Sequence, residues 1–319
     1  MRIDVVVPCF NERECVSLFY GELKKTLEAK GGCDFRVIYV DDGSRDDTLS
    51  EVKALKKQDP ARVEYISFAR NFGKEAAIYA GLRASRAELT AIMDADLQDP
   101  PALLLEMLEG IEEGYDCCVA RRADRAGEPV VRSFFSDMYY RIMNRFSSVK
   151  LRPGVRDFRL MTRRVLEAAL LLEERERFSK GMLAWVGFKT KYIDYKNAPR
   201  AGGRTKWSFW GLFKYAVGGI TAFSTAPLRF AVLLGLLTIG ASFAYMAYVV
   251  IITLAHGRET PGFATIISML IFLCGVIIFL QGITGEYLAR MYTEIKKRPI
   301  YITKEDSFGN DDESAESKT

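Results

Sequence analysis

Short apolar runs alternate with amphipathic stretches over about the first 200 residues of this chain of 319 residues. The apolar runs predict strands over residues 3–7, 35–40, 63–68 and 89–93, the first of which is closed by Pro8. The stretches between them predict helices over residues 14–29, 48–57 and 76–84. Strands that are separated by helices favour a mainly parallel, Rossmann-like sheet with helices on both faces, so we expect an α/β domain.

The apolar pattern changes near Arg229. Residues 230–254 and 262–285 contain no charged residue, and each run exceeds the roughly 20 residues that cross a bilayer as a helix. The short connector between them predicts a transmembrane hairpin; the alternative is a pair of buried core helices. Basic residues flank the hairpin on both sides, namely Lys206, Lys214, Arg229, Arg290, Lys296, Lys297 and Arg298. The positive-inside rule therefore places both termini in the cytoplasm, at the plasma (inner) membrane.

These patterns divide the chain into four segments. Residues 1–200 form the expected cytoplasmic α/β domain, and residues 229–289 form the hairpin. Residues 201–228 predict a basic loop and interfacial helices, because 207–223 are apolar and aromatic with a single charge; the alternative is a packed helix that joins the domains. Residues 290–319 predict a helix or strand and an acidic tail, which we expect to be disordered from Tyr301 onward. Met1 leads directly into the first strand, so a signal peptide is not expected.

Composition limits the chemistry. The chain has 45 Lys and Arg against 41 Asp and Glu, and no nucleic acid is expected among its partners. The six cysteines show no Cys-x-x-Cys spacing, which indicates reduced thiols and not a disulfide framework. The only histidine is His256, which argues against histidine acid–base catalysis and against a histidine-ligated metal.

Polar clusters follow all four predicted strands at their carboxyl ends, where sheets of this kind bind ligands. The clusters are Pro8-Cys9-Phe10-Asn11-Glu12, Asp41-Asp42-Gly43-Ser44, Ala69-Arg70-Asn71-Phe72-Gly73-Lys74 and Asp94-Ala95-Asp96-Leu97-Gln98. Carboxylate and amide oxygens suit Mg2+ or Mn2+, ions that commonly bind substrate phosphates. The strand ends therefore predict a site for a phosphate-rich nucleotide bound through a divalent ion. The alternative is a set of solvated turns and helix caps.

The four clusters also carry a family resemblance. The strings VVVPCFNE, VDDGS, RNFGKEAA and DADLQDPP, in this order and spacing, resemble the inverting nucleotide-sugar glycosyltransferases of the GT-A fold, glycosyltransferase family 2. The chain more closely resembles the polyisoprenyl-phosphate glycosyltransferases, which include dolichol-phosphate mannose synthases and bacterial undecaprenyl-phosphate glucosyltransferases. The resemblance covers about residues 1–298, including VRDFRLM, RAGGRTKW and the two apolar spans. The QxxRW-type signature of processive synthases is absent from the sequence, which favours a single transfer per acceptor.

The resemblance implies roles for residues at the strand ends. Those expected at the nucleotide-sugar site are Pro8, Asn11, Glu12, Asp42, Lys74, Asp94, Ala95 and Asp96. Among them, the resemblance implies nucleoside contacts for Pro8, Glu12 and Asp42. It also implies that Asp94 and Asp96, together with Gln98, hold the donor diphosphate and a cofactor ion, Mg2+ or Mn2+.

Basic residues predict the contacts to phosphate. Residues 121–164 carry twelve Arg or Lys against four acids, and guanidinium groups match phosphate oxygens; the alternative is a solvated basic surface. The glycine-rich loop 200–206 suits a basic flap that closes over both phosphates, or else a plain juxtamembrane anchor. The basic and hydroxyl residues that we expect to act in catalysis are Arg122, Arg132, Ser136, Arg204 and Lys206.

Asp157 resembles the family's acid near the donor sugar. We expect it to orient the sugar or the acceptor, or to take up a proton; the alternative is an ion pair with Arg156 or Arg159. In the implied reaction an oxygen of the lipid phosphate attacks the anomeric carbon and displaces the nucleoside diphosphate with inversion. A phosphate monoester has a second pKa of about 6, so this nucleophile is mostly ionised near neutral pH. A strong general base is therefore less necessary than for a sugar hydroxyl.

The expected activity is metal-dependent transfer of one sugar, with UDP-glucose as the donor and undecaprenyl phosphate as the acceptor. UDP-GlcNAc, GDP-mannose and a modified UDP-pentose stay open as alternative donors. Two other classes are a non-catalytic, membrane-anchored nucleotide-sugar binding scaffold and a lipid-linked-sugar flippase. The Asp94–Gln98 cluster and Asp157 argue against the first, and spans without ionisable residues argue against the second. The spans also make a homo-oligomer possible.

Overall fold

The computed structural model describes residues 2–29, 33–122, 141, 144–145, 149–150, 152–195, 221, 224–256 and 262–308. The strands are β1 (Arg2–Cys9), β2 (Asp34–Asp41), β3 (Val63–Phe68), β4 (Leu89–Ile92), β5 (Cys117–Arg122), β6 (Val155–Thr162), β7 (Thr190–Tyr195) and β8 (Thr303–Asp306). The helices are α1 (Arg13–Ala29), α2 (Thr48–Gln58), α3 (Lys74–Ala84), α4 (Leu103–Glu112), α6 (Arg163–Leu170), α7 (Ser179–Trp185), α9 (Ala226–His256) and α10 (Phe263–Ile295).

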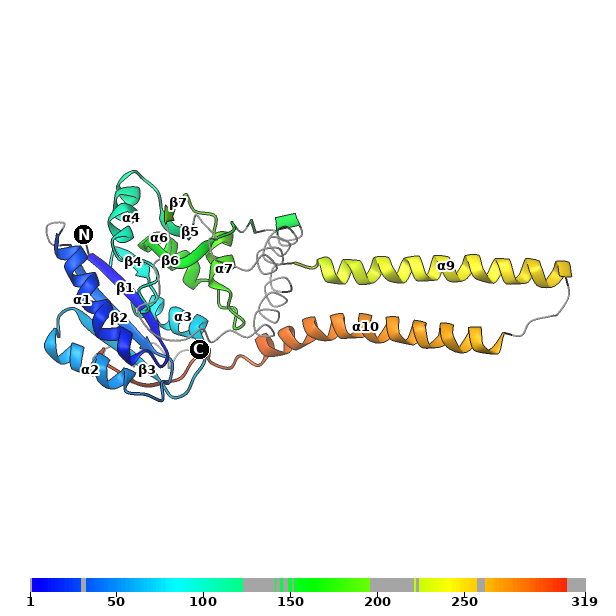
Figure 1. The fold of residues 1–319 in the computed structure, drawn as a ribbon, viewed down its shortest axis with the longest axis horizontal. Coiled ribbons are helices and arrows are strands. Elements are labelled where there is room, and N and C mark those ends of the chain that lie inside the picture. The colour runs from blue at the N-terminus through cyan, green and yellow to red at the C-terminus, as the bar shows by residue number, and fades with distance from the viewer. Residues whose placement is uncertain are drawn as a thin grey trace.

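The strands form one sheet of eight in the order β7-β5-β6-β4-β1-β2-β3-β8 (Figure 1). Strand β1 pairs in parallel with β2 and β4, and β2 pairs in parallel with β3. Of the described strands only β6 and β8 run in the opposite direction. The expectation of a mainly parallel sheet is therefore confirmed, and the carboxyl ends of β1 to β4 lie at one edge.

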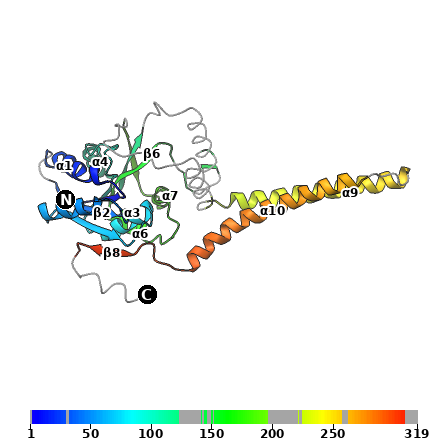
Figure 2. The same cartoon turned by 60° about the horizontal axis from the view of Figure 1, so that its bottom comes forward.

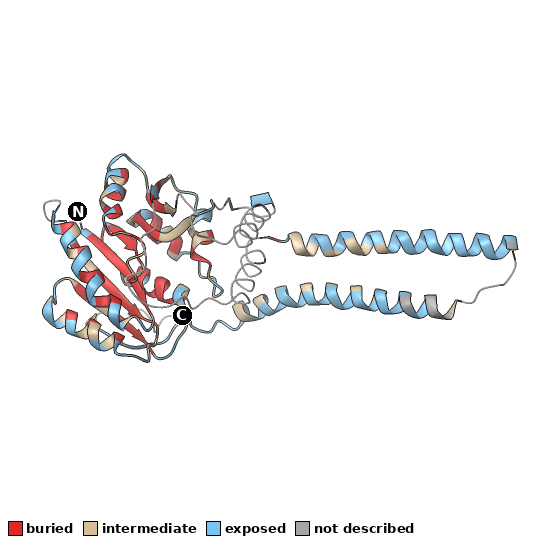
Figure 3. Ribbon diagram, viewed as in Figure 1, coloured by how far each residue is buried: buried red, intermediate tan, exposed pale blue. Residues whose placement is uncertain are grey.

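Alternate residues of the central strand face two apolar layers. Ile3, Val5 and Val7 pack in a cluster with residues of α1, α2 and α4, whereas Val6 packs with residues of α3 and α6. This alternation is the geometry of a strand buried on both faces. The buried residues concentrate in the sheet and on the inner sides of its helices (Figure 3).

Pro8 does not end the first strand, contrary to our expectation. The strand continues to Cys9, and Pro8 pairs in register with Val40 of β2. The carbonyl of Val6 accepts the amide of Met93 on the β4 side, and Pro8 faces that side because it lies two residues further along. The registered pairing with β4 stops at Val6, so the missing amide of Pro8 interrupts no ladder bond.

Two long helices extend away from the sheet domain (Figure 1). Segments of both, Ala226–Ala255 and Met269–Ile295, are long and apolar enough to cross a membrane, and their windows are not buried inside the protein. The predicted spans 230–254 and 262–285 lie almost entirely within α9 and α10, which continue beyond them. The interfacial helices expected within 207–223 lie outside the described residues, apart from residue 221.

The chain after α10 returns to the sheet. Strand β8 pairs antiparallel with the edge strand β3 (Figure 2), and the Tyr301 ring stacks on Phe68 with centroids 4.9 Å apart. The expectation of disorder from Tyr301 onward is therefore wrong as far as Phe308, which packs against the core. Residues 309–319 lie outside the described part of the chain. The polar composition of this segment concealed a strand whose partner is distant in sequence.

Candidate active site

The end of β2 holds the loop that follows β3. Asp42 is 3% exposed, and its carboxylate accepts the backbone amides of Phe72 and Gly73 at 2.6 and 2.9 Å. Burial raises the pKa of Asp42, although these two bonds lower it. The next residue, Gly43, has φ +66°, and a Cβ there would lie 2.5 Å from the carbonyl carbon of Arg70. Only glycine permits such a close approach of the two loops.

The ends of β1 and β2 are joined by backbone-directed hydrogen bonds. Asn11 Oδ1 accepts the amide of Arg45 at 2.8 Å, and the Asn11 amide donates to Ser44 Oγ at 2.9 Å. The Glu12 amide donates to Thr48 Oγ1 at 2.8 Å. The structure thus brings Pro8, Asn11, Glu12 and Asp42 to adjacent strand ends, as their positions in the sequence predict. The nucleoside contacts of Pro8, Glu12 and Asp42 stay predictions, as does the place of Asn11 at the nucleotide-sugar site.

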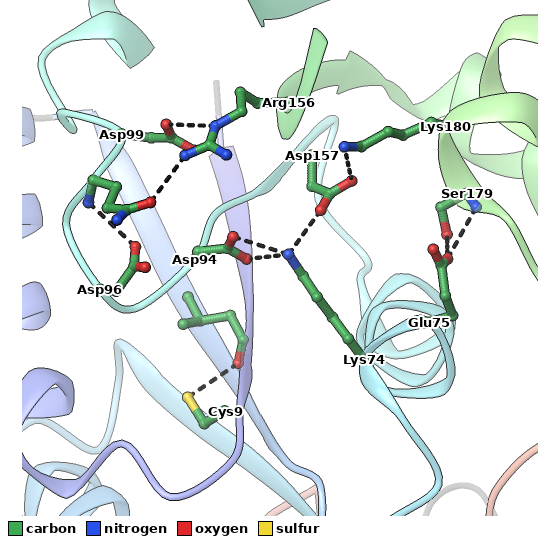
Figure 4. Close-up of polar contacts among 12 residues, drawn as sticks. Cys9, Lys74, Glu75, Asp94, Asp96, Asp99, Arg156, Asp157, Ser179 and Lys180 are labelled. Carbon is green, nitrogen blue, oxygen red and sulfur yellow. Dashed lines mark hydrogen bonds and ion pairs between the residues drawn. The ribbon is translucent and has the colours of Figure 1, made fainter. Parts of the chain in front are cut away.

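Lys74 joins the carboxylates of Asp94 and Asp157 (Figure 4). We call the edge of the sheet that carries Asp42, Lys74, Asp94, Asp96 and Asp157 the rim. Lys74 Nζ lies 2.7 Å from Asp94 Oδ1 and 2.7 Å from Asp157 Oδ2. Partial burial lowers the pKa of Lys74, but the charges of Asp94 and Asp157 outweigh it and raise the pKa above the ordinary value. Burial alone would raise the pKa of Asp157, but the charges of Lys180 and Lys74 hold it well below its usual range. Asp157 is therefore a carboxylate at neutral pH and not a proton donor.

Two further cations meet Asp157. Lys180 Nζ of α7 lies 3.6 Å from Asp157 Oδ1, and Arg159 Nε donates to the Asp157 carbonyl at 3.2 Å. Ser179, the residue before Lys180, donates both its amide, at 2.9 Å, and its hydroxyl to Glu75 Oε2. Lys180 was not among the predicted site residues, because no pattern in the sequence links it to an acid on a distant strand. The ion pairs of Asp157 within the described residues are with Lys74 and Lys180, while the charge of Arg159 also lowers the pKa of Asp157.

The loop after β4 is held by Arg156. Its Nη2 donates to Gln98 Oε1 at 3.0 Å, and its Nε lies 3.4 Å from Asp99 Oδ1. The Tyr195 hydroxyl also donates to Asp99. Burial raises the pKa of Asp99, which is 4% exposed, while Arg156 lowers it. These contacts fix the segment that carries Asp96, whose Oδ1 accepts the Gln98 amide at 3.2 Å.

The oxygen donors on this rim fit Mg2+ or Mn2+ in chemistry. Asp94 and Asp96 supply carboxylates, and the Gln98 oxygen, which accepts a hydrogen bond from Arg156, has a second lone pair that could bind an ion. Within the described residues no group of three or more Asp, Glu, His or Cys side chains is assembled for a metal. Ala95 is fully buried and its side chain packs in the core, so its expected place at the nucleotide-sugar site, which stays a prediction, would depend on its backbone.

The predicted phosphate-binding residues are only partly placed. Arg122 lies at the carboxyl end of β5, and its amide donates to the Gly154 carbonyl at 2.9 Å. Arg132, Ser136, Arg204 and Lys206 lie outside the described residues. Their roles stay predictions.

Comparison with known families and proteins agrees with this architecture. The family model "Glycosyl transferase family 2" matches residues 4–170, and the model "GtrB C-terminal hairpin" matches residues 226–291. The putative glycosyltransferase CsbB of Bacillus subtilis is 44% identical over 97% of this chain and 93% of its own length. The SfII prophage-derived bactoprenol glucosyl transferase of Shigella flexneri is 39% identical over 97% of this chain and 100% of its own.

Solved structures align more weakly. The glucosyl-3-phosphoglycerate synthase of Mycobacterium tuberculosis aligns with 69% of this chain and 77% of its own, with a TM-score of 0.45 and 20% identity. The family matches and the full-length relatives decide the assignment. With its GT-A-like α/β domain followed by two long apolar helices, this chain belongs to glycosyl transferase family 2.

Proposed function

We propose that this glycosyltransferase transfers one glucose from UDP-glucose to a polyprenyl phosphate, such as bactoprenol (undecaprenyl) phosphate, at the membrane. The relatives with "bactoprenol glucosyl transferase" in their names are up to 39% identical over nearly the whole chain. The observation that carries the proposal is the joining, in one chain, of the acidic rim around Asp94 and Asp157 to two helices of membrane-spanning length. The two features together fit a nucleotide-sugar donor and an acceptor that is held in a membrane.

The residues that would bind the nucleotide-sugar donor act electrostatically on its diphosphate. Asp94 and Asp96 are the residues that would hold Mg2+ or Mn2+, which when bound neutralises charge on the departing diphosphate. Lys74 lies between Asp94 and Asp157, so its ammonium is within reach of a diphosphate seated on the rim. Two anionic substrates have to approach one another here, and fixed cations lower the cost of that approach.

Asp157 acts as a fixed carboxylate in the proposed reaction. Lys74 and Lys180 hold it ionised and in one position. Because the phosphate nucleophile is already mostly ionised near neutral pH, Asp157 has no proton that it must remove. Its role is to orient the sugar or the acceptor while the phosphate oxygen attacks the anomeric carbon and the nucleoside diphosphate leaves.

The hairpin places this chemistry at a membrane face. Basic residues on both sides of the spans, including Arg229 and Arg290, favour a cytoplasmic location for the catalytic domain and both termini at the inner membrane. Nucleotide-sugars are cytoplasmic metabolites, so this orientation gives the rim access to the donor.

The test is transfer by the full-length chain in phospholipid vesicles that contain polyprenyl phosphate and Mg2+ or Mn2+. Radiolabelled UDP-glucose is expected to give label in the organic extract, and UDP-GlcNAc and GDP-mannose much less. Asp157→Asn should abolish transfer. Asp34→Asn is the matched control, because Asp34 is 69% exposed at the amino end of β2, away from the rim. The absence of organic-soluble label with every donor would refute the proposal.

A further inference from the structure

The base of α10 is attached to the loop that precedes α7. The Arg175 amide donates to Glu294 Oε1 at 2.8 Å, and Arg175 Nε donates to the Arg298 carbonyl at 2.7 Å. One residue further along the loop, Glu176 lies 2.9 Å from Arg290. Arg175 Nη1 also lies 3.7 Å from Glu294 Oε2. Contacts from two successive loop residues therefore tie a membrane-length helix, and the segment that follows it, to a loop of the catalytic domain.

The same loop leads directly into α7, whose first two residues, Ser179 and Lys180, contact Glu75 and Asp157 (Figure 4). Ser179 is held by Glu75 through its amide and its hydroxyl, and Lys180 lies 3.6 Å from Asp157. Glu75 is adjacent to Lys74, the other cation on Asp157. Arg175 contacts α10 and Lys180 contacts Asp157. The two residues are therefore only a few positions apart in the chain.

The other side of the α10 base is also anchored. After the helix ends, the Ile302 carbonyl accepts the amide of Ala69 at 3.0 Å, and Tyr301 stacks on Phe68. Figure 2 shows this segment running from α10 along the edge of the catalytic domain to β8. Attachment at two places prevents α10 from swinging as a flexible tether would.

We propose that Arg175 and Glu294 are positioning residues that fix the height of Asp157 above the membrane, so that the phosphate of a bilayer-held acceptor meets the donor at the rim. The proposal rests on the lipid acceptor proposed above. The depth of α10 in the bilayer is set by its apolar length, and the acceptor phosphate is likewise confined to the headgroup layer. A misplacement of about 1 Å between reacting groups costs up to about 100-fold in rate.

Two acceptors separate this role from a general structural one. For the full-length Glu294→Ala chain in vesicles, kcat/KM with long-chain polyprenyl phosphate should fall about tenfold, because the rim is no longer held at the right height. With a water-soluble short-chain prenyl phosphate it should change less than about twofold. Glu294→Gln keeps an oxygen for the Arg175 amide and should recover most of the loss.

The matched control is Glu28→Ala. Glu28 pairs with Arg62 at 2.6 Å and is 46% exposed, against 40% for Glu294, but it lies on α1 away from the hairpin. Glu28→Ala should leave kcat/KM unchanged with both acceptors. Equal losses of Glu294→Ala with the two acceptors, or no loss with either, would overturn the proposal.

Amide hydrogen exchange tests the coupling without any transfer assay. In the Glu294→Ala chain the Arg175 amide loses its partner, and protection should also fall at Ser179, whose amide is bonded to Glu75. Faster exchange at Arg175 with unchanged protection at Ser179 would contradict the coupling. If the wild type transfers glucose to neither acceptor, the proposed function is wrong, and the exchange result alone decides whether α10 positions the Asp157 segment.

Discussion

Replacing Lys74 by methionine keeps the length of the side chain and removes the charge between Asp94 and Asp157. The ammonium makes a 2.7 Å contact with each carboxylate. A charge-assisted hydrogen bond contributes about 1.5–3 kcal/mol, so two fully buried bonds would contribute about 3–6 kcal/mol. Lys74 is 42% exposed and Asp94 is 34% exposed, and solvent screening lowers that sum to about 2–3 kcal/mol.

This loss is large enough to measure by thermal unfolding of the full-length chain in detergent with a metal chelator present. At about 2–4 °C per kcal/mol for a domain of this size, the Tm of Lys74→Met should fall by about 4–12 °C. The control is Lys191→Met, which removes a single ion pair of similar length, 2.6 Å, with Glu113, whose side chain is 52% exposed against 18% for Asp157. It should move the Tm far less, because exposed pairs contribute little.

The pH dependence checks the cause. Lys180 and Lys74 depress the pKa of Asp157, so the stabilisation from this carboxylate is present above its unfolded pKa of about 4 and is lost as the pH falls through its lower folded pKa. Without Lys74 the folded pKa rises, and less stabilisation remains to be lost. The Tm difference between the two proteins should therefore be largest near neutral pH and narrow in acid. A Tm of Lys74→Met that equals that of Lys191→Met at pH 7 would refute the reasoning.

Three further substitutions test other parts of the site. Gly43→Ala places a Cβ 2.5 Å from the Arg70 backbone at φ +66°, a strain of about 1–3 kcal/mol; calorimetry should show weaker UDP binding, and unchanged affinity would contradict the close approach. Asp96→Asn should raise the Mn2+ concentration needed for half-maximal transfer, and an unaltered metal dependence would remove Asp96 from the ion. Tyr195→Phe leaves the buried Asp99 with one partner fewer and should lower the free energy of unfolding by about 1–3 kcal/mol in urea titrations, whereas an unchanged midpoint would mean that Arg156 alone suffices.

The strands of the first half of the domain were predictable because burial on both faces leaves a continuous apolar run in the sequence. The predicted strand 63–68 coincides with β3, and the predicted ends of β2 and β4 lie within one residue of those observed, whereas β1 continues two residues beyond its predicted end. Since the topology of a parallel sheet brings carboxyl ends together, the positions of Asp42 and Asp94 followed from the same pattern.

The contacts across the site were not predictable in this way. Lys74 and Asp157 are far apart in the chain, and their pairing depends on β6 running antiparallel beside β4. Strand β8 was missed because its residues are polar, and its stability comes from the open edge of β3 and the stacking of Tyr301 on Phe68. Both features are tertiary, and no local pattern encodes them.

The most direct measurement of the proposed reaction is the mass spectrum of the lipid extract after the purified full-length chain acts on UDP-glucose and polyprenyl phosphate in vesicles with Mn2+. The expected product is the polyprenyl phosphate carrying a single hexose, with one UDP released per lipid, and no product from Asp157→Asn. An unmodified lipid in the presence of intact protein and donor, or UDP released without a glycosylated lipid, would contradict sugar transfer to a lipid phosphate at this site.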